Sequence, residues 1–140
     1  MTRGEIVTLM TSRQEAFERR DLRALARLYS EHCVLESPMA GTVTGREAIE
    51  QVYQGLFSAF PDLVLSSDEI LIDGDRVAQT LTLAGTDMGG FMGLAPTGKR
   101  FRVPVVVLST MKDRQIVAEK RVYDFTGLLV QVGILKAKPL

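Results

Sequence analysis

Apolar residues recur at helical spacing through the first part of the chain. From Glu5 to Arg20 they fall three or four residues apart, and Asp21 is a typical cap for a second helical stretch that reaches Tyr29. A capping box at Thr44 to Glu47 opens a third amphipathic stretch, which Pro61 ends. The apolar stripe of this third stretch consists of Ile49, Val52, Tyr53, Leu56 and Phe60. These patterns predict helices, with a brief strand at residues 33–35 before the third stretch.

The second half of the chain has the pattern of strands. We expect strands at residues 63–72, 76–85, 99–111 and 115–124, with a glycine-rich loop over 86–98. Asp73-Gly74 favours a tight hairpin, and Asp124 or Thr126 can cap a short final helix. Helices followed by an antiparallel meander predict an α+β fold in one domain, residues 1–140. In such a fold the helices pack on a strongly curved, mainly antiparallel sheet that encloses a pocket.

Charge and cysteine content narrow the class of partner. Seventeen basic and seventeen acidic side chains balance without long runs of either sign, so we expect neither nucleic acid nor a membrane as partner. A small apolar molecule fits better. The single cysteine, Cys33, cannot form an internal disulfide, and no N-terminal apolar run resembles a signal peptide, which favours a cytoplasmic setting. With one histidine, His32, beside that cysteine, we expect no metal site.

One segment, GLAPTGKRF at residues 93–101, almost matches a phosphate-binding loop. Such a loop needs a hydroxyl residue after its lysine and a helix whose amides point at the phosphates. Here Arg100 follows Lys99, and the next residues are β-branched and include Pro104, which is typical of a strand. The segment therefore predicts the end of a loop between two strands and not a nucleotide site.

The C-terminal half resembles a known family. The residues that carry the resemblance are Gly85-Thr86-Asp87, Phe91 to Arg100, Gln115-Ile116-Val117, Tyr123-Asp124-Phe125, Gly127-Leu128-Leu129 and Gln131-Val132-Gly133. In order and spacing they look like the SnoaL-like polyketide cyclases, which have the cone of the nuclear transport factor 2-like fold. The resemblance implies an intramolecular aldol ring closure without cofactor, in an apolar pocket, with Asp124 as general acid and base.

The chain departs from that family at three positions. Gln79, Asp87 and Lys120 stand where family members often carry an arginine, a histidine and a tryptophan. All three are candidates for substrate binding. Lys120 and Asp124 are four residues apart on one predicted strand, so they share a face, and the ammonium group would hold Asp124 ionised.

Four further residues are candidates for contact with a ligand. Phe91 and Met92 lie in the glycine-rich loop, which we expect near the pocket mouth. Tyr53 carries a polar tip that can reach inward, and His32 is a candidate base at the rim.

Two other functions stay open beside the cyclase. One is a non-catalytic small-molecule binding protein with the same pocket. The other is an epoxide hydrolase of the same fold, in which Asp124 would act with Arg102 or Arg121, although strand alternation places Arg121 on the opposite face. A ketosteroid isomerase is disfavoured because Ser37 stands where that enzyme keeps its aspartate base.

We also expect a homodimer. The strand at residues 99–111 has valines at 103, 105 and 107 on one face, with Val106 and Leu108 on the other. Because it is apolar on both faces, one side can form the core and the other an interface.

Overall fold

The computed structural model describes residues 1–137 and has an α+β fold, as the sequence predicts. The helices are α1 (Arg3–Glu18), α2 (Leu22–Arg27), α3 (Arg46–Ala59) and α4 (Phe125–Gln131). The strands are β1 (Tyr29–Ser37), β2 (Gly41–Thr44), β3 (Val64–Asp73), β4 (Arg76–Thr86), β5 (Arg100–Lys112) and β6 (Gln115–Tyr123). None of the helices in residues 1–137 has the length and apolarity needed to cross a membrane.

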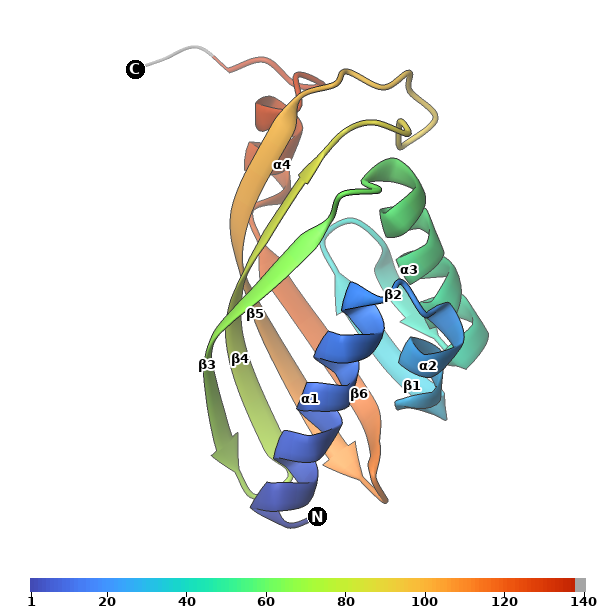
Figure 1. Cartoon of the computed structure of the whole chain (residues 1–140), viewed down its shortest axis with the longest axis vertical. Coiled ribbons are helices and arrows are strands. Elements are labelled where there is room, and N and C mark those ends of the chain that lie inside the picture. Colours follow the sequence, from blue (N-terminus) through green and yellow to red (C-terminus); the bar gives the residue numbers. More distant parts are fainter. Residues whose placement is uncertain (138–140) are drawn as a thin grey trace.

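The six strands form one curved sheet in the order β2-β1-β6-β5-β4-β3. Every neighbouring pair is antiparallel except β1 and β6, which run parallel. The helices α1, α2 and α3 lie against the concave side of the sheet, and α4 lies at the end of the molecule opposite the N-terminus (Figure 1). The expected cone, with helices on a strongly curved and mainly antiparallel sheet, is confirmed.

Local signals explain where the first two helices begin. At α1, Thr2 and Glu5 form a capping box, in which the Glu5 amide donates to Thr2 Oγ1 at 3.1 Å and the Thr2 amide donates to Glu5 Oε1 at 3.0 Å. At α2, the Asp21 side chain accepts from the Ala24 amide at 3.0 Å, as predicted. Both caps satisfy backbone donors that the helix itself leaves without partners.

The predicted capping box at Thr44 is wrong. Thr44 pairs with Val34 as the last residue of β2, so it belongs to the sheet, and α3 starts after Gly45 without a side-chain cap. Gly45 has φ +97°, a backbone conformation that residues with a Cβ rarely adopt, which explains glycine at this turn from strand to helix. At the last helix, Asp124 and not Thr126 is the cap.

A β-bulge in β6 sets which side chains face the helices. Thr110 pairs with Ala118 and Met111 pairs with Ile116, so Val117 has no partner across the ladder. The extra residue reverses the alternation, and therefore Ile116 and Glu119 are both buried beneath the helices while Lys120 is exposed.

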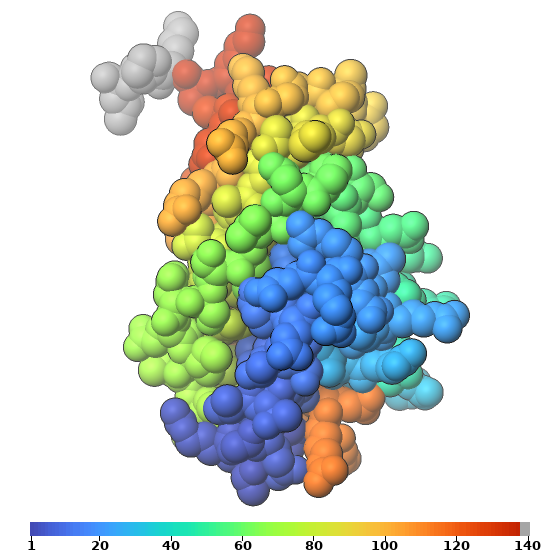
Figure 2. Space-filling model, viewed as in Figure 1, coloured from blue at the N-terminus to red at the C-terminus, as the bar shows by residue number. Residues whose placement is uncertain are grey.

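Aromatic packing fills one end of the concave space. Phe60 at the end of α3 lies edge-to-face on Phe101, with ring centroids 4.8 Å apart, and on Phe91 at 5.1 Å. In the space-filling view, α1 and α2 cover the concave side of the sheet between β3 and α3 (Figure 2). A cavity remains between the helices and the middle of the sheet.

Candidate functional site

A narrow cavity lies between α1, α3 and the concave face of β3 to β6. Its volume is about 60 Å³, and much of its wall is apolar, with Met10, Phe17, Leu56, Leu65, Leu81 and Val105 among its members. A cavity that holds benzene measures about 150 Å³. A polycyclic ligand therefore needs some wall side chains to move, and Met10 and Met39 are flexible enough to do so.

Polar side chains gather on one part of this wall, around the buried carboxylate of Glu119. Arg13 from α1 pairs with Glu119 Oε1, and Arg121 Nε donates to Glu119 Oε2 at 3.0 Å. Only 2% of Glu119 is exposed, and both arginine side chains are nearly buried as well. Arg13 and Arg121 are among the residues that line the cavity, whereas Glu119 is not.

Two tyrosines connect the cavity to the same carboxylate. The Tyr29 hydroxyl donates to Glu119 Oε2 at 2.9 Å, and it lies 2.6 Å from the Tyr53 hydroxyl. Tyr53 lines the cavity, and the Arg121 guanidinium stacks over its ring at 4.8 Å from the centroid. The phenol groups thus form a continuous hydrogen-bonded path from the cavity to Glu119.

Gln79 extends the cluster along β4. Its Oε1 accepts from Arg13 Nη2 at 3.2 Å, and its Nε2 donates to Ser67 Oγ at 2.9 Å. Ser109 adds a hydroxyl 3.4 Å from Glu119 Oε1. Within residues 1–137 every buried side-chain nitrogen and oxygen has a hydrogen-bond partner, so the cluster is fully satisfied.

The charges of the cluster fix its protonation states. Burial by itself would raise the pKa of Glu119, but the Arg13 and Arg121 cations outweigh burial and hold the pKa below its usual value. Burial and the Glu119 charge raise the pKa of Tyr29 well above its usual value. At neutral pH the cluster therefore contains two guanidinium cations, one carboxylate and a protonated Tyr29.

This arrangement leaves one positive charge in excess at an apolar cavity. No aspartate, glutamate or histidine is among the cavity-lining residues in the part of the chain that the structure describes. A ligand oxygen that carries or develops negative charge is therefore favoured next to Arg13 and Arg121, because the low-dielectric surroundings strengthen the attraction.

Two of the residues expected at the site do line the cavity. Gln79 and Tyr53 are both buried wall residues, 5% and 3% exposed, and both belong to the polar cluster. They come from β4 and α3, so the fold brings them together as the alternation in β4 and the apolar stripe in α3 suggested.

Asp124 and Lys120 do not lie at the cavity. Asp124 is exposed and caps α4, with Oδ1 accepting from the Gly127 amide at 2.8 Å. Lys120 is exposed on the outer face of β6. The bulge at Val117 explains why the expected face of β6 points away from the cavity, because it turns Glu119 and Arg121 toward the helices. An epoxide-hydrolase pairing of Asp124 with Arg121 is disfavoured for the same reason, and Arg102 is exposed elsewhere on β5.

The other expected residues have structural or surface positions. Asp87 is fully buried in the 87–98 loop, where it accepts from the Gly90 and Thr97 amides and the Thr97 hydroxyl, each at 3.1 Å. Phe91 packs on the core, and Met92 is 59% exposed, so neither lines the cavity. His32 is exposed on β1.

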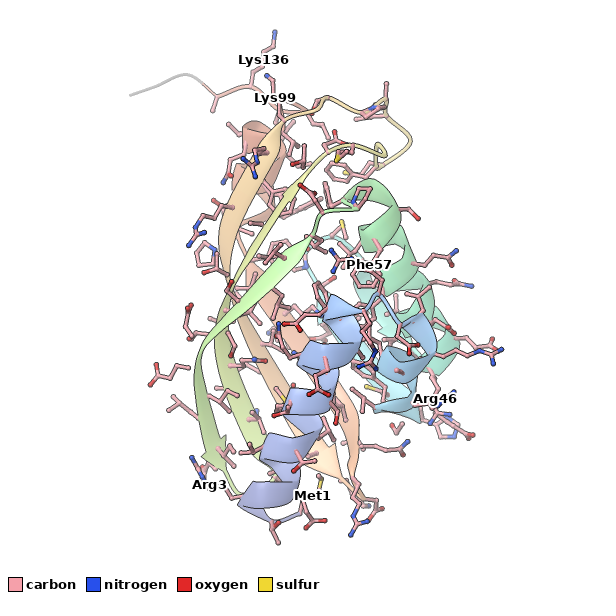
Figure 3. All side chains as sticks on the ribbon, viewed as in Figure 1. Met1, Arg3, Arg46, Phe57, Lys99 and Lys136 are labelled. Atoms are coloured by element: carbon pink, nitrogen blue, oxygen red, sulfur yellow. The ribbon has the colours of Figure 1, made fainter. Side chains whose placement is uncertain are left out.

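The phosphate-loop lookalike ends in a strand, as predicted. Gly98 has φ +71°, and β5 begins at Arg100, so no helix N-terminus follows Lys99. Lys99 projects at the end of the molecule near Lys136, far from Met1 and Arg3 at the opposite end (Figure 3).

Sequence reasoning missed the centre of the cluster. The sequence pattern does not indicate Glu119, Arg13 or Tyr29 as site residues, and it brings in Arg121 only in the disfavoured epoxide-hydrolase pairing. One signal was present, because Arg13 occurs in the apolar stripe of α1 between Met10 and Phe17, and a charged residue on a buried face requires a partner. The partner, Glu119, could not be named without the fold.

A curved α+β cone with a mostly apolar cavity defines a class of small-molecule proteins, and the comparisons identify the family within it. The chain belongs to the SnoaL-like polyketide cyclase family, whose model matches residues 7–132. No curated protein matches the chain.

Solved structures agree with this assignment. AclR from Streptomyces galilaeus, a proposed hydroxylase, is 30% identical, with a TM-score of 0.84 over 99% of this chain and 87% of that chain. IdmH from Streptomyces antibioticus, a proposed polyketide cyclase, is also 30% identical, with a TM-score of 0.77 over 91% of this chain and 97% of that chain. A SnoaL-like protein from Jannaschia sp. CCS1 shares the fold at 22% identity and a TM-score of 0.84, over 97% of this chain and 94% of that chain.

Proposed function

We propose that this protein is a small-molecule enzyme of the polyketide-cyclase type, which closes a ring by an intramolecular aldol reaction without a cofactor. The observation that carries the proposal is the excess positive charge of Arg13 and Arg121 over Glu119 at the wall of an apolar cavity. The family assignment and the likeness to the proposed cyclase IdmH support it.

The chemistry of ring closure fits this charge. Removal of a proton next to a carbonyl group leaves an enolate, and attack of the enolate on a second carbonyl group leaves an alkoxide. Both anions are stabilised by fixed cations and donors that need no reorganisation, here the guanidinium groups of Arg13 and Arg121 and the amide of Gln79. The apolar wall binds the carbon skeleton and holds the reacting carbons close together.

Asp124 has no part in this proposal. Its side chain is exposed and hydrogen-bonded to the Gly127 amide, so a substrate in the cavity would not meet it. The expected general acid and base therefore has to be supplied by another group or by the substrate itself.

The alternative function is non-catalytic binding of the same kind of ligand. The observation that favours it is that the described cavity wall contains no carboxylate or imidazole able to take a proton directly. A carrier would use Arg13 and Arg121 only to attract an enolic or phenolic oxygen.

Binding and turnover can be measured separately. Alizarin is a flat, ionisable polycyclic ketone whose colour reports its charge, and we expect it to ionise at lower pH when bound, because the two cations stabilise the anion. Arg121→Gln should weaken this colour shift. Incubation with acyclic 1,5-diketones, in which a terminal enolate carbon can close a six-membered ring on the second carbonyl group, should give cyclised products of unchanged mass, measured by NMR and mass spectrometry. Alizarin binding without any cyclisation would favour the carrier, and no binding of either kind of compound would contradict both functions.

We also propose a homodimer formed through the outer face of the sheet. Val106, Leu108 and Val122 are exposed there on the adjacent strands β5 and β6, and Val106 lies opposite Val122 in the ladder. Exposed apolar side chains that form a contiguous patch are typical of an interface.

A further inference from the structure

The hydrogen bonds of the buried cluster have a fixed direction. Tyr29 has one hydroxyl proton, and it donates that proton to Glu119 Oε2 at 2.9 Å. The 2.6 Å contact between Tyr29 and Tyr53 must then use the proton of Tyr53, with the Tyr29 oxygen as acceptor. Because its own proton points away from the cavity, Tyr53 has oxygen lone pairs left with which to accept a proton from the cavity side.

We propose that Tyr53, Tyr29 and Glu119 form a proton relay, in which Tyr53 takes a proton from the carbon next to a substrate carbonyl group and Glu119 finally receives it. This inference rests on the proposed function and assigns the base that the cavity wall otherwise lacks. Tyr53 is the catalytic residue because it lines the cavity, while Tyr29 and Glu119 act through it.

The relay balances in atoms and charge. The substrate C–H bond breaks, its electron pair stays on the substrate as the enolate, and its proton goes to the Tyr53 oxygen. At the same time the Tyr53 proton moves to the Tyr29 oxygen and the Tyr29 proton moves to Glu119 Oε2. After the enolate carbon attacks the second carbonyl carbon, the three protons move back, and Tyr53 protonates the new alkoxide. The product is an isomer of the substrate, and no co-reactant is used.

The two arginines remain paired with a negative charge throughout. Before the transfer they pair with the Glu119 carboxylate, and after it they pair with the enolate, because both arginines contact Glu119 and are also cavity-lining residues. The negative charge is therefore displaced and not created, so the low dielectric of the site does not oppose the step.

The protonation states agree with this path. The raised pKa of Tyr29 keeps its phenol protonated, so it passes a proton on and does not rest as a phenolate. The lowered pKa of Glu119 keeps the terminal acceptor ionised at neutral pH. The buried Glu119 carboxylate can therefore receive the substrate proton through the two tyrosines without contacting the substrate.

The relay can be tested with 2-tetralone, a two-ring ketone with acidic C–H bonds next to its carbonyl group. NMR in D2O measures the exchange of these protons for deuterium, and ligand-observed NMR measures binding in the same samples. We expect Tyr53→Phe and Tyr29→Phe each to bind 2-tetralone as wild type does and to lose about 100-fold in protein-catalysed exchange. Asp124→Asn is the control, because Asp124 is exposed outside the cavity and asparagine keeps the cap of α4, and it should retain the wild-type exchange.

The pH profile separates the relay from a structural role of the tyrosines. Exchange through Glu119 requires only the carboxylate, so the wild-type rate, corrected for the uncatalysed reaction, should be level from neutral pH down to the lowered pKa of Glu119. A tyrosine that acts alone as a phenolate base would give a rate that rises with pH toward about 10.

Each other outcome overturns the relay. Full exchange in Tyr29→Phe, or a rate that rises toward the tyrosine range, would show that Glu119 is not the acceptor. Binding of 2-tetralone by wild type without exchange would contradict the relay and leave the carrier function intact. Failure of wild type to bind 2-tetralone at all would count against the proposed function as well.

Discussion

At the scale of single residues, Glu119 determines the character of the site. Its carboxylate is surrounded by Arg13, Arg121 and Tyr29, which come from α1, β6 and β1. A buried ion pair adds little stability relative to an apolar pair of the same size, but removal of one partner is costly, because it leaves a charge buried without compensation. The free energy of unfolding should therefore respond strongly to a substitution that removes one charged member of this cluster.

Glu119→Gln should destabilise the protein by about 3–5 kcal/mol, because the two guanidinium cations would remain buried without their carboxylate. Urea denaturation followed by circular dichroism measures the change. Arg114→Gln is the control, because it breaks the solvent-exposed pair with Glu5 and should leave the midpoint unchanged. Equal midpoints for wild type and Glu119→Gln would contradict the buried network.

The lowered pKa of Glu119 also predicts how stability depends on pH. The folded-state pKa lies below the ordinary value of 4.5, so the contribution of Glu119 is complete above that pH and is lost as the pH falls through the folded-state pKa. Urea midpoints measured between pH 6 and about 3 should fall more steeply for wild type than for Glu119→Gln. Parallel curves would show that Glu119 does not titrate as described.

At the scale of elements, α4 depends on the residue that the family resemblance marked as catalytic. Asp124 caps α4 through the Gly127 amide, and the Cβ that an alanine at Gly127 would add lies 2.2 Å from Asp124 Oδ2. The cap and the helix that it starts are thus closely packed, which gives both residues a structural role.

Asp124→Ala should cost about 1 kcal/mol of stability, whereas Asp124→Asn should cost little, because asparagine caps helices as well as aspartate does. Thr126→Ala should have no effect, since Thr126 is not the cap. Thermal melts measure all three. In the 2-tetralone assay Asp124→Asn should exchange protons at the wild-type rate, and a large loss there would restore Asp124 as the base.

The 87–98 loop depends in the same way on Asp87. Asp87→Ala would leave the Gly90 and Thr97 amides without their acceptor at a buried position, so we expect a loss of about 1–3 kcal/mol and faster amide exchange in this loop. Hydrogen–deuterium exchange measures the loop directly. Asp68→Ala, at an exposed position on β3, is the control and should leave the loop amides protected.

At the scale of the whole molecule, the sheet has one face toward the cavity and one toward a proposed second copy. Val106→Lys should shift the protein toward the monomer in sedimentation velocity, because a charge would be buried against the partner's apolar face. Met92→Lys is the control, since Met92 is an exposed apolar residue in the 87–98 loop and away from the sheet. A wild-type protein that sediments as a monomer would contradict the proposed homodimer.

The sequence by itself determined the α+β class, the helices and the four strands after Leu63, because helix and strand periods, Pro61 and Asp73-Gly74 are local signals. It also identified Gln79 and Tyr53. It did not predict β2 or the full length of β1. Only the tertiary structure decided the rest. The bulge at Val117 depends on pairing with β5, and it selects which face of β6 reaches the cavity. Arg13 and Glu119 are 106 residues apart, so their contact exists only when α1 packs across the sheet.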